Sequence, residues 1–261
     1  MRGIFSTGVL DAFYDHHYRP FDFCLGVSAG STNLAAWLAH QRGRNHKVIT
    51  DYSCRPQFIS FKRFLWGGHW LDLDWLWDIT IREIRLDLEA FAEQPIPLYV
   101  VTAKVTDGQA AYIRATPENL EQLLKASCSV PIVYRRFTMI GGEPMTDGGV
   151  ADSIPVIKAY EMGARDITVI LSRPAGYRKR PPRSPWLLRR ILWKTPQLAE
   201  AMITRASRYN HSIDFIEKPP PGCRIRVIAP PRTFAVGRMT TDFAKLREGY
   251  EMGLKAAETI Q

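Results

Sequence analysis

The chain alternates between short apolar segments and longer segments with helical periodicity. Four short segments rich in apolar or β-branched residues predict strands: residues 21–27, 98–104, 166–171 and 224–228. Four longer segments with apolar residues at helical spacing predict helices: residues 4–16, 29–40, 154–162 and 241–259. Because strands and helices alternate, the pattern predicts an α/β layered fold around a largely parallel sheet.

Glycine-containing turns predict two hairpins. Residues 110–114 are expected to pair with the strand at 98–104 across the Asp-Gly turn at 107–108. Residues 139–145 form the second predicted hairpin, which turns at the two glycines 141–142.

Other local signals mark helix ends and one interruption. Thr116 as N-cap and Pro117 as the first helical residue predict a helix that runs to residue 126. Gly163 suits the C-cap of the helix at 154–162. Residues 173–194 contain four prolines and break the α/β rhythm, so we expect a surface excursion there.

Composition bounds the class of protein. With 261 residues, 46% of them apolar, the chain suits one globular domain over residues 1–261, although two small domains would also fit. No run of about 18 uncharged apolar residues predicts a transmembrane helix, and the start does not read as a signal peptide. The four cysteines lie far apart: Cys24, Cys54, Cys128 and Cys223. This spacing favours reduced thiols in a cytoplasmic protein, and we expect neither a metal nor a cofactor.

The net charge of +9 is concentrated in one segment. Residues 173–194 hold eight Lys or Arg and no acidic residue, which favours anionic partners or is simply a solvated loop. Four apolar residues lie among these cations: Trp186, Leu187, Ile191 and Trp193. They suit peripheral contact with an anionic membrane, and would equally suit packing on the core. No nucleic-acid motif accompanies the charge, so nucleic acid is not expected as a partner.

The strongest chemical signal is Gly-Val-Ser-Ala-Gly at residues 26–30, between a predicted strand and a predicted helix. In this context G-x-S-x-G is typical of a nucleophilic serine, here Ser28, on a strained turn. Gly26 and Gly30 are expected at the flanking positions because a Cβ there would clash. The turn also places the hydroxyl at a helix N-terminus, where free N–H groups favour negative charge.

A nucleophilic serine needs a base, and the six histidines offer no clear candidate. None lies in an obvious loop between a strand and a helix, and His211 falls in a predicted helix, where a surface or packing role is expected. Asp147 fits better, because it follows the hairpin at 139–145 and precedes Gly148 and Gly149, which let the backbone approach another segment. A common turn without chemistry would also explain Asp-Gly-Gly.

Several motifs together resemble the patatin-like phospholipase family. They are the start MRGIF, the GVSAG pentapeptide, the segment 125–136 with Ala126, Ser127 and Pro131, and TDGGVADSIPV from residue 146. Their order and spacing fit the family over at least residues 1–171, and the tail resembles a bacterial subgroup.

This resemblance implies a three-layer α/β/α fold and a Ser-Asp dyad in place of a triad. Ser28 matches the nucleophile of the family and Asp147 the dyad aspartate, with Gly148 and Gly149 in the dyad loop. The family's substrates are acyl esters of lipids, typically phospholipids, lysophospholipids or neutral glycerides. An acyl-serine intermediate and its hydrolysis by water follow from this chemistry.

The chain departs from the family at the oxyanion hole. The family carries a buried strand and a glycine-rich run before Arg-Gly, whereas Met1 directly precedes Arg2 and Gly3 here. Arg2 and Gly3 match the end of that motif, and their amides are the expected oxyanion donors. Either the recorded start lies too far downstream, which we favour, or the protein lacks this element.

Two alternatives to a lipid acyl hydrolase stay open: a catalytically weak or inactive relative that binds lipid or membranes, and acyl transfer to an acceptor other than water. An apolar cluster adds a further ambiguity. It comprises Trp66, Trp70, Trp75 and Trp77 with Leu71, Leu73 and Leu76. These residues suit an acyl pocket or a lid, and also ordinary core packing.

Overall fold

The computed structural model describes residues 1–258, in which strands and helices alternate as expected. The strands are β1 (Cys24–Val27), β2 (Leu98–Lys104), β3 (Ala110–Arg114), β4 (Thr138–Ile140), β5 (Glu143–Asp147), β6 (Asp166–Ile170) and β7 (Arg224–Ile228). The α-helices are α1 (Gly3–Asp15), α2 (Ala29–Leu38), α3 (Arg44–Lys47), α4 (Phe61–Leu65), α5 (Leu73–Glu83), α6 (Leu88–Glu93), α7 (Leu120–Cys128), α8 (Val156–Glu161), α9 (Pro185–Ile191), α10 (Pro196–Glu217) and α11 (Phe243–Ala257). A π-helical segment (Val48–Tyr52) and a 3₁₀ turn (Gly148–Val150) complete the elements.

Five strands form one mixed sheet around β2. β1 pairs with β2 in parallel, whereas β3 and β5 pair with β2 antiparallel and β4 pairs antiparallel with β5. Because β3 occupies one edge of β2, β1 and β5 lie end to end along the other edge. This shared edge brings the end of β1 next to the end of β5.

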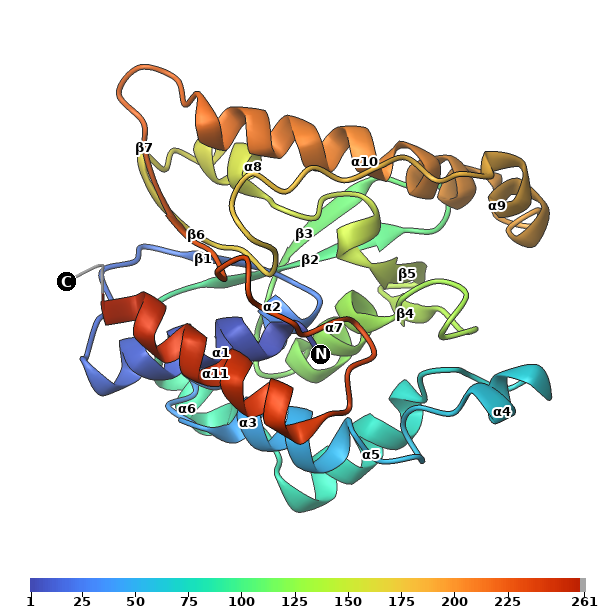
Figure 1. The fold of residues 1–261 in the computed structure, drawn as a ribbon, viewed down its shortest axis with the longest axis horizontal. Helices are drawn as coiled ribbons and strands as arrows, with labels where there is room; N and C mark the ends of the chain where they lie inside the picture. Colours follow the sequence, from blue (N-terminus) through green and yellow to red (C-terminus); the bar gives the residue numbers. More distant parts are fainter. Residues whose placement is uncertain (259–261) are drawn as a thin grey trace.

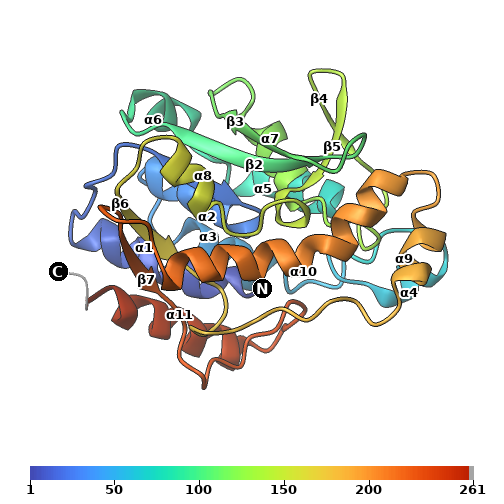
Figure 2. The same ribbon diagram turned by 90° about the horizontal axis from the view of Figure 1, so that it is seen from above.

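The expectation of a largely parallel sheet is not confirmed. Short turns join β2 to β3 and β4 to β5, and such connections produce antiparallel neighbours. Among the described strands, the second parallel pair is β6 with β7, which forms a sheet of its own. The α/β class itself is confirmed, with α8 and α10 on one side of the strands and α1, α2 and α11 on the other (Figures 1 and 2).

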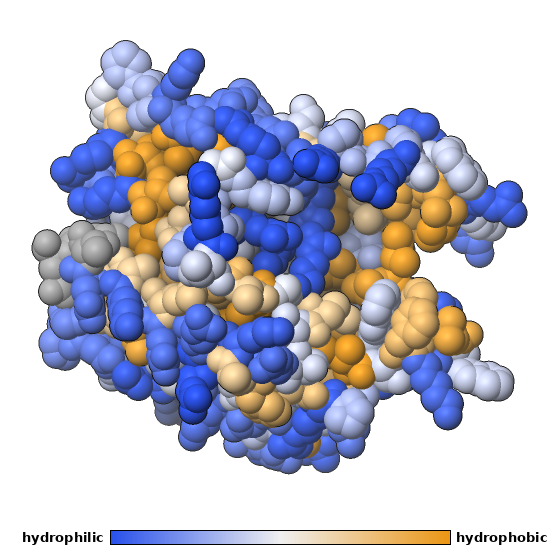
Figure 3. Space-filling view, viewed as in Figure 1, coloured by the Kyte–Doolittle hydropathy of each residue, from blue (hydrophilic) through white to orange (hydrophobic). Residues whose placement is uncertain are grey.

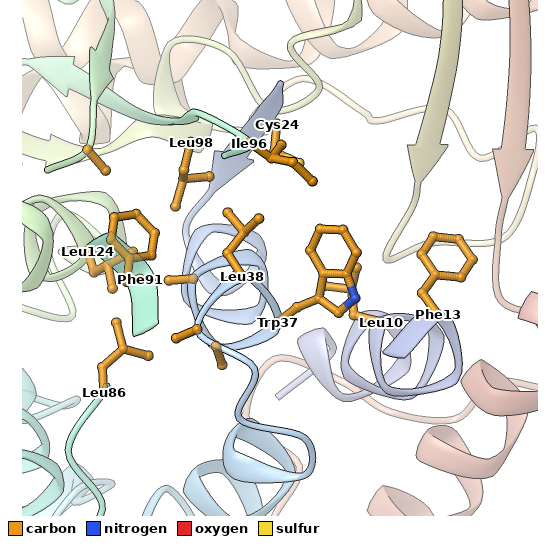
Figure 4. Close-up of a cluster of buried hydrophobic side chains, with 14 of the residues drawn as sticks. Leu10, Phe13, Cys24, Trp37, Leu38, Leu86, Phe91, Ile96, Leu98 and Leu124 are labelled. Carbon is orange, nitrogen blue, oxygen red and sulfur yellow. The ribbon is translucent and has the colours of Figure 1, made fainter. Parts of the chain in front are cut away.

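The main core lies between β1, β2 and the helices α1, α2, α6 and α7. Trp37 and Leu38 of α2 pack there against Leu98 of β2 and Phe13 of α1 (Figure 4). A second cluster fills the space between α8, α10 and the β6–β7 pair. These two cores hold β1 and its following turn from both sides.

Most predicted elements occur close to their expected bounds, with two differences. β1 begins at Cys24 and not at residue 21, because Phe21 packs its ring against Phe13, Tyr18 and Trp37 in place of entering the ladder. The helix expected from Pro117 begins at Leu120 after a turn. The closing helix is described to Ala257, and its expected end at Thr259 lies outside the described residues.

Candidate active site

Ser28 lies on the turn between β1 and α2, and its backbone has a conformation that residues other than glycine rarely adopt. Its φ is 52° and its ψ is −129°, a region that costs about 1–3 kcal/mol for a residue other than glycine. A Cβ on Gly26 would lie 2.5 Å from the Cα of Ser31, so this glycine is required by close approach. A Cβ on Gly30 would have nothing within 4 Å, so the expected steric need is absent there.

Ser127 holds the strained turn in place. Its Oγ accepts a hydrogen bond of 2.7 Å from the backbone N–H of Ser28 and donates one of 2.7 Å to the carbonyl of Val101 on β2. The Ser127 side chain is fully buried, so water cannot replace either bond. The backbone of the candidate nucleophile is thereby tied to the central strand.

Asp147 ends β5 at the level where β1 ends. Val27 pairs with Val101 on β2, and Asp147 pairs with the next residue, Thr102. The Ser28 side chain consequently lies close enough to the Asp147 carboxylate to lower its pKa through hydrogen bonding. Two groups that are 119 positions apart in the sequence, from 28 to 147, therefore meet in space.

The Asp147 carboxylate is buried, and burial raises its pKa above the ordinary aspartate value. The nearby Arg205 guanidinium, the hydrogen bond from Ser28 and the N–H of Gly149 act in the opposite direction. The Gly149 N–H donates a bond of 2.7 Å to Oδ1 of Asp147. This combination gives a carboxylate that is more basic than usual and has a fixed orientation.

The dyad loop needs its first glycine for a close approach. A Cβ on Gly148 would lie 2.1 Å from the carbonyl oxygen of Val101, whereas on Gly149 the nearest atoms would be Oδ1 of Asp147 and Nη2 of Arg205, at 2.9 and 3.0 Å. The loop therefore runs directly against β2. It also brings the Arg205 guanidinium beside Asp147.

Arg2 and Gly3 lie at the start of α1, and both line the same cavity as Ser28. A Cβ on Gly3 would lie 2.8 Å from the Cβ of Ala29, so the starts of α1 and α2 are in direct contact. The carbonyl of Gly3 is held by Asn33 through a hydrogen bond of 2.9 Å. Free amides at a helix start attract negative charge, which suits Arg2, Gly3 and also Ala29 as oxyanion donors.

A cavity of about 1250 Å³ opens beside Ser28 and Asp147. From the predicted tryptophan cluster, five residues line it: Trp70, Leu71, Leu73, Leu76 and Trp77. Leu73 and Leu76 are at the same time part of a buried apolar cluster, so they both line the cavity and pack in the core. Trp66, in contrast, is 84% exposed and lies outside the cavity lining.

Histidines and metal-binding clusters do not contribute to this site in the part of the chain that is described. No histidine lines the cavity, and His211 is exposed on α10. Residues 1–258 contain no group of three His, Cys, Asp or Glu side chains placed to hold a metal ion. The four cysteines are unpaired, and burial raises the pKa of Cys128, an effect that the nearby Ser28 hydroxyl counteracts.

The basic segment at 173–194 divides into two parts. Its first part turns inward, where Arg173, Tyr177 and Lys179 line the cavity. Its second part contains α9, which projects from the body of the protein with Trp186 and Trp193 exposed. The segment is therefore partly a surface excursion and partly a wall of the candidate site (Figure 1).

Sequence reasoning missed three contributors to the site. Ser127 belongs to one of the family motifs, but its bond to the Ser28 backbone is visible only in the structure. Arg205 lies in the middle of the long helix α10, and Cys128 is the residue after Ser127. Nothing in the local sequence around Arg205 distinguishes it from the other basic residues of this chain.

Comparisons with known proteins show which family the chain resembles. Residues 1–160 match the family model described as Patatin-like phospholipase. Residues 195–260 match a second model, described as Domain of unknown function (DUF6363). The protein described as "Uncharacterized protein YjjU" of Escherichia coli (strain K12) is 32% identical over 259 residues, which cover 97% of this chain and 72% of that protein.

Proposed function

Because the chain belongs to the patatin-like phospholipase family, we propose that it is a serine acyl hydrolase that cleaves lipid acyl esters through Ser28 and Asp147. One observation carries the proposal. The hydroxyl of Ser28, on a strained turn, lies beside the buried carboxylate of Asp147 at the edge of a large cavity. A serine hydroxyl, a carboxylate that can act as its base and an open cavity in one place support this proposal.

The proposed reaction has two halves. Asp147 accepts the proton of Ser28 as the serine oxygen bonds to the ester carbonyl carbon, and it passes this proton to the departing alcohol. The result is an acyl-serine. Water then gives its proton to Asp147 and attacks the acyl carbon, and the proton returns to the Ser28 oxygen as the fatty acid leaves.

Stabilisation of the oxyanion is proposed for the amides at the starts of α1 and α2. The N–H groups of Arg2, Gly3 and Ala29 lie at these two helix starts, which are in contact. Each well-placed donor is worth about 3 kcal/mol in the transition state. The Ser127 bond supports this arrangement indirectly, because it fixes the backbone from which Ala29 follows.

A fluorophosphonate probe tests the dyad. The wild type should be labelled and Ser28→Ala should not, whereas Asp147→Asn should be labelled and should turn over esters more slowly, by a factor on the order of 10²–10⁴. Asp152→Asn is a matched control, because Asp152 is another aspartate whose pKa is raised by burial, and its bond is to Tyr112. Absence of labelling in the folded wild type would contradict the proposed hydrolase and favour the lipid-binding relative.

We further propose peripheral contact with an anionic membrane through one end of the molecule. None of the helices in residues 1–258 has the length and apolar character to cross a bilayer. Helices α4 and α9 project at the same end of the molecule in both ribbon views, and Figure 3 shows apolar surface on both projections. Their exposed residues include Leu65 and Trp66 at the end of α4, Trp186 in α9 and Trp193 just after α9, each 65–84% exposed.

The positive charge beside α9 favours anionic lipids. Arg183, Arg190 and Lys194 are exposed beside the apolar residues of α9, and within the described residues none of them forms an ion pair. Each such cation contributes about 1 kcal/mol near an anionic surface. Together, the apolar and basic groups suit an interfacial segment.

Co-sedimentation with vesicles measures this contact. Wild-type protein should bind anionic vesicles more strongly than neutral ones, and the double variant Trp186→Ser, Trp193→Ser should lose most of the binding. Phe243→Ser is the matched control, since Phe243 is 60% exposed but begins α11. Equal binding to both kinds of vesicle would refute the electrostatic part.

A further inference from the structure

Five basic side chains line the cavity near the candidate dyad. They are Arg2, Arg173, Lys179, Arg205 and Arg238, named here the basic cluster. They come from four distant parts of the chain: the N-terminus, the segment after β6, helix α10 and the loop before α11. In Figure 3, hydrophilic surface gathers in the middle of the face between α10 and α11.

Within the described residues no ion pair neutralises the basic cluster, although Asp147 lies near Arg205. Among the ion pairs of residues 1–258, none involves a member of the cluster, whereas the neighbouring Arg178 pairs with both Asp214 and Glu217. The Nε atoms of Arg2 and Arg173 are buried without a hydrogen-bond partner. Buried donors of this kind are normally satisfied.

Other contacts of the basic cluster are weak or serve to orient it. Lys179 Nζ lies 4.4 Å from the centre of the Tyr209 ring, and the Arg173 guanidinium lies 4.7 Å from that of Tyr177. Arg205 Nε is 3.4 Å from Ser153 Oγ. These contacts hold the cations without neutralising them.

The lowered pKa values of Arg2 and Lys179 indicate that the cations of the basic cluster repel one another and are not neutralised. Burial, with the charges of Arg173 and Arg238, lowers the pKa of Arg2 to about 10. Burial, with Arg205, Arg238 and Arg2, lowers the pKa of Lys179 to about 7. The one carboxylate that counteracts these effects at Lys179 and Arg205 is Asp147, which the proposed reaction uses as its base.

We propose that the basic cluster is a subsite for a phosphate group, and that the phosphate belongs to the headgroup of the lipid whose ester Ser28 cleaves. This inference rests on the proposed hydrolase function and narrows its substrates to phosphorylated glycerolipids. Guanidinium groups recognise phosphate through paired hydrogen bonds, and a lysine adds a point charge. A neutral glyceride has no phosphate and would leave the cations of the basic cluster without an anionic partner.

The subsite also assigns a role to the second family match. Arg205 and Arg238 both fall in residues 195–260, the region matched by the domain of unknown function. Arg205 reaches the loop that carries Asp147, since its Nη2 would lie 3.0 Å from a Cβ on Gly149. The C-terminal region thus supplies headgroup recognition to a nucleophile carried by residues 1–160.

A pair of substrates with the same acyl chain tests the subsite. Hydrolysis of lysophosphatidic acid and of the uncharged monoacylglycerol is compared as a ratio of kcat/KM. In Lys179→Gln and Arg238→Gln this ratio should fall about tenfold, in Lys179→Arg it should be largely retained, and in Arg178→Gln it should equal that of the wild type. An unchanged ratio in all variants overturns the headgroup assignment.

Inorganic phosphate separates a headgroup site from a site for free phosphate. Its binding to wild-type and variant protein is followed as a rise in Tm over chloride at equal ionic strength. Weaker phosphate binding in Lys179→Gln and Arg238→Gln, with an unchanged substrate ratio, would assign the cluster to free phosphate and overturn the lipid assignment. If wild type cleaves neither ester, the hydrolase proposal fails, and phosphate binding still decides whether the cluster is an anion site.

Discussion

Replacement of Ser127 by alanine tests how the structure positions the nucleophile. Ser127→Ala removes the acceptor of the Ser28 N–H, a bond of 2.7 Å in a fully buried position. A buried N–H without a partner costs about 1–3 kcal/mol. For a chain of this length, with roughly 2 cal/mol/K of unfolding entropy per residue, that cost lowers Tm by about 2–5 °C.

The effect on catalysis should exceed the effect on stability. Without its anchor, the strained backbone of Ser28 can relax and turn the hydroxyl away from Asp147, and misplacement of a reacting group by about 1 Å can cost roughly 10²-fold in rate. We therefore expect kcat to fall about 10²-fold with little change in KM. The assay is hydrolysis of a short p-nitrophenyl ester, with fluorophosphonate labelling rates as a second measure.

Ser129→Ala provides the matched control. Ser129 is equally buried, and its hydroxyl bonds to the carbonyl of Lys125, not to the turn at Ser28. It should lose similar stability and keep far more activity. If Ser127→Ala kept kcat within about threefold while its Tm fell, the conclusion that Ser127 holds the nucleophile would be wrong.

Three further predictions concern protonation and backbone contact. Asp147 must be ionised to act as a base, and burial raises its pKa. The pH profile of kcat/KM should therefore have an acidic limb above pH 3.8. Arg205→Gln removes a positive charge that favours the ionised form of Asp147, so this variant should have its acidic limb at higher pH. Binding of sulfate, whose charge is constant in this range, should weaken in titration calorimetry as pH rises through about 7, because Lys179 loses its proton there. Burial and the cations of the basic cluster lower this pKa, and Asp147 counteracts them. Gly148→Ala should lower Tm, because a Cβ there would lie 2.1 Å from a carbonyl oxygen of β2 and overpacking costs about 1–3 kcal/mol. Gly30→Ala is the control: a Cβ there would have nothing within 4 Å, so Tm should stay unchanged or rise.

Local elements were predictable wherever their signals lie in neighbouring residues. The strands β2 and β3 have the predicted bounds, and the hairpin of β4 and β5 turns at Gly141 and Gly142, whose φ values are 57° and 83°. Prediction failed where packing overrode local preference. Phe21 has strand propensity but packs with other aromatic rings, and the antiparallel pairing of β5 with β2 has no signature in either segment.

The sequence by itself determined the candidate nucleophile. The strained turn needs Gly26 to pack closely against Ser31 and a helix to begin directly after Ser28. The residues that meet both requirements are neighbours in the sequence. It also indicated Asp147, although only through resemblance to a family.

Tertiary structure alone decided that Ser28 and Asp147 meet, and that five cations line the same cavity. The two side chains meet because β1 and β5 share one edge of β2, with Val101 and Thr102 as successive partners. Sequence patterns report which face of an element is buried, but not which strands become neighbours. That choice depends on the packing of the whole chain, because contacts between distant segments are stable only when the rest of the core forms with them.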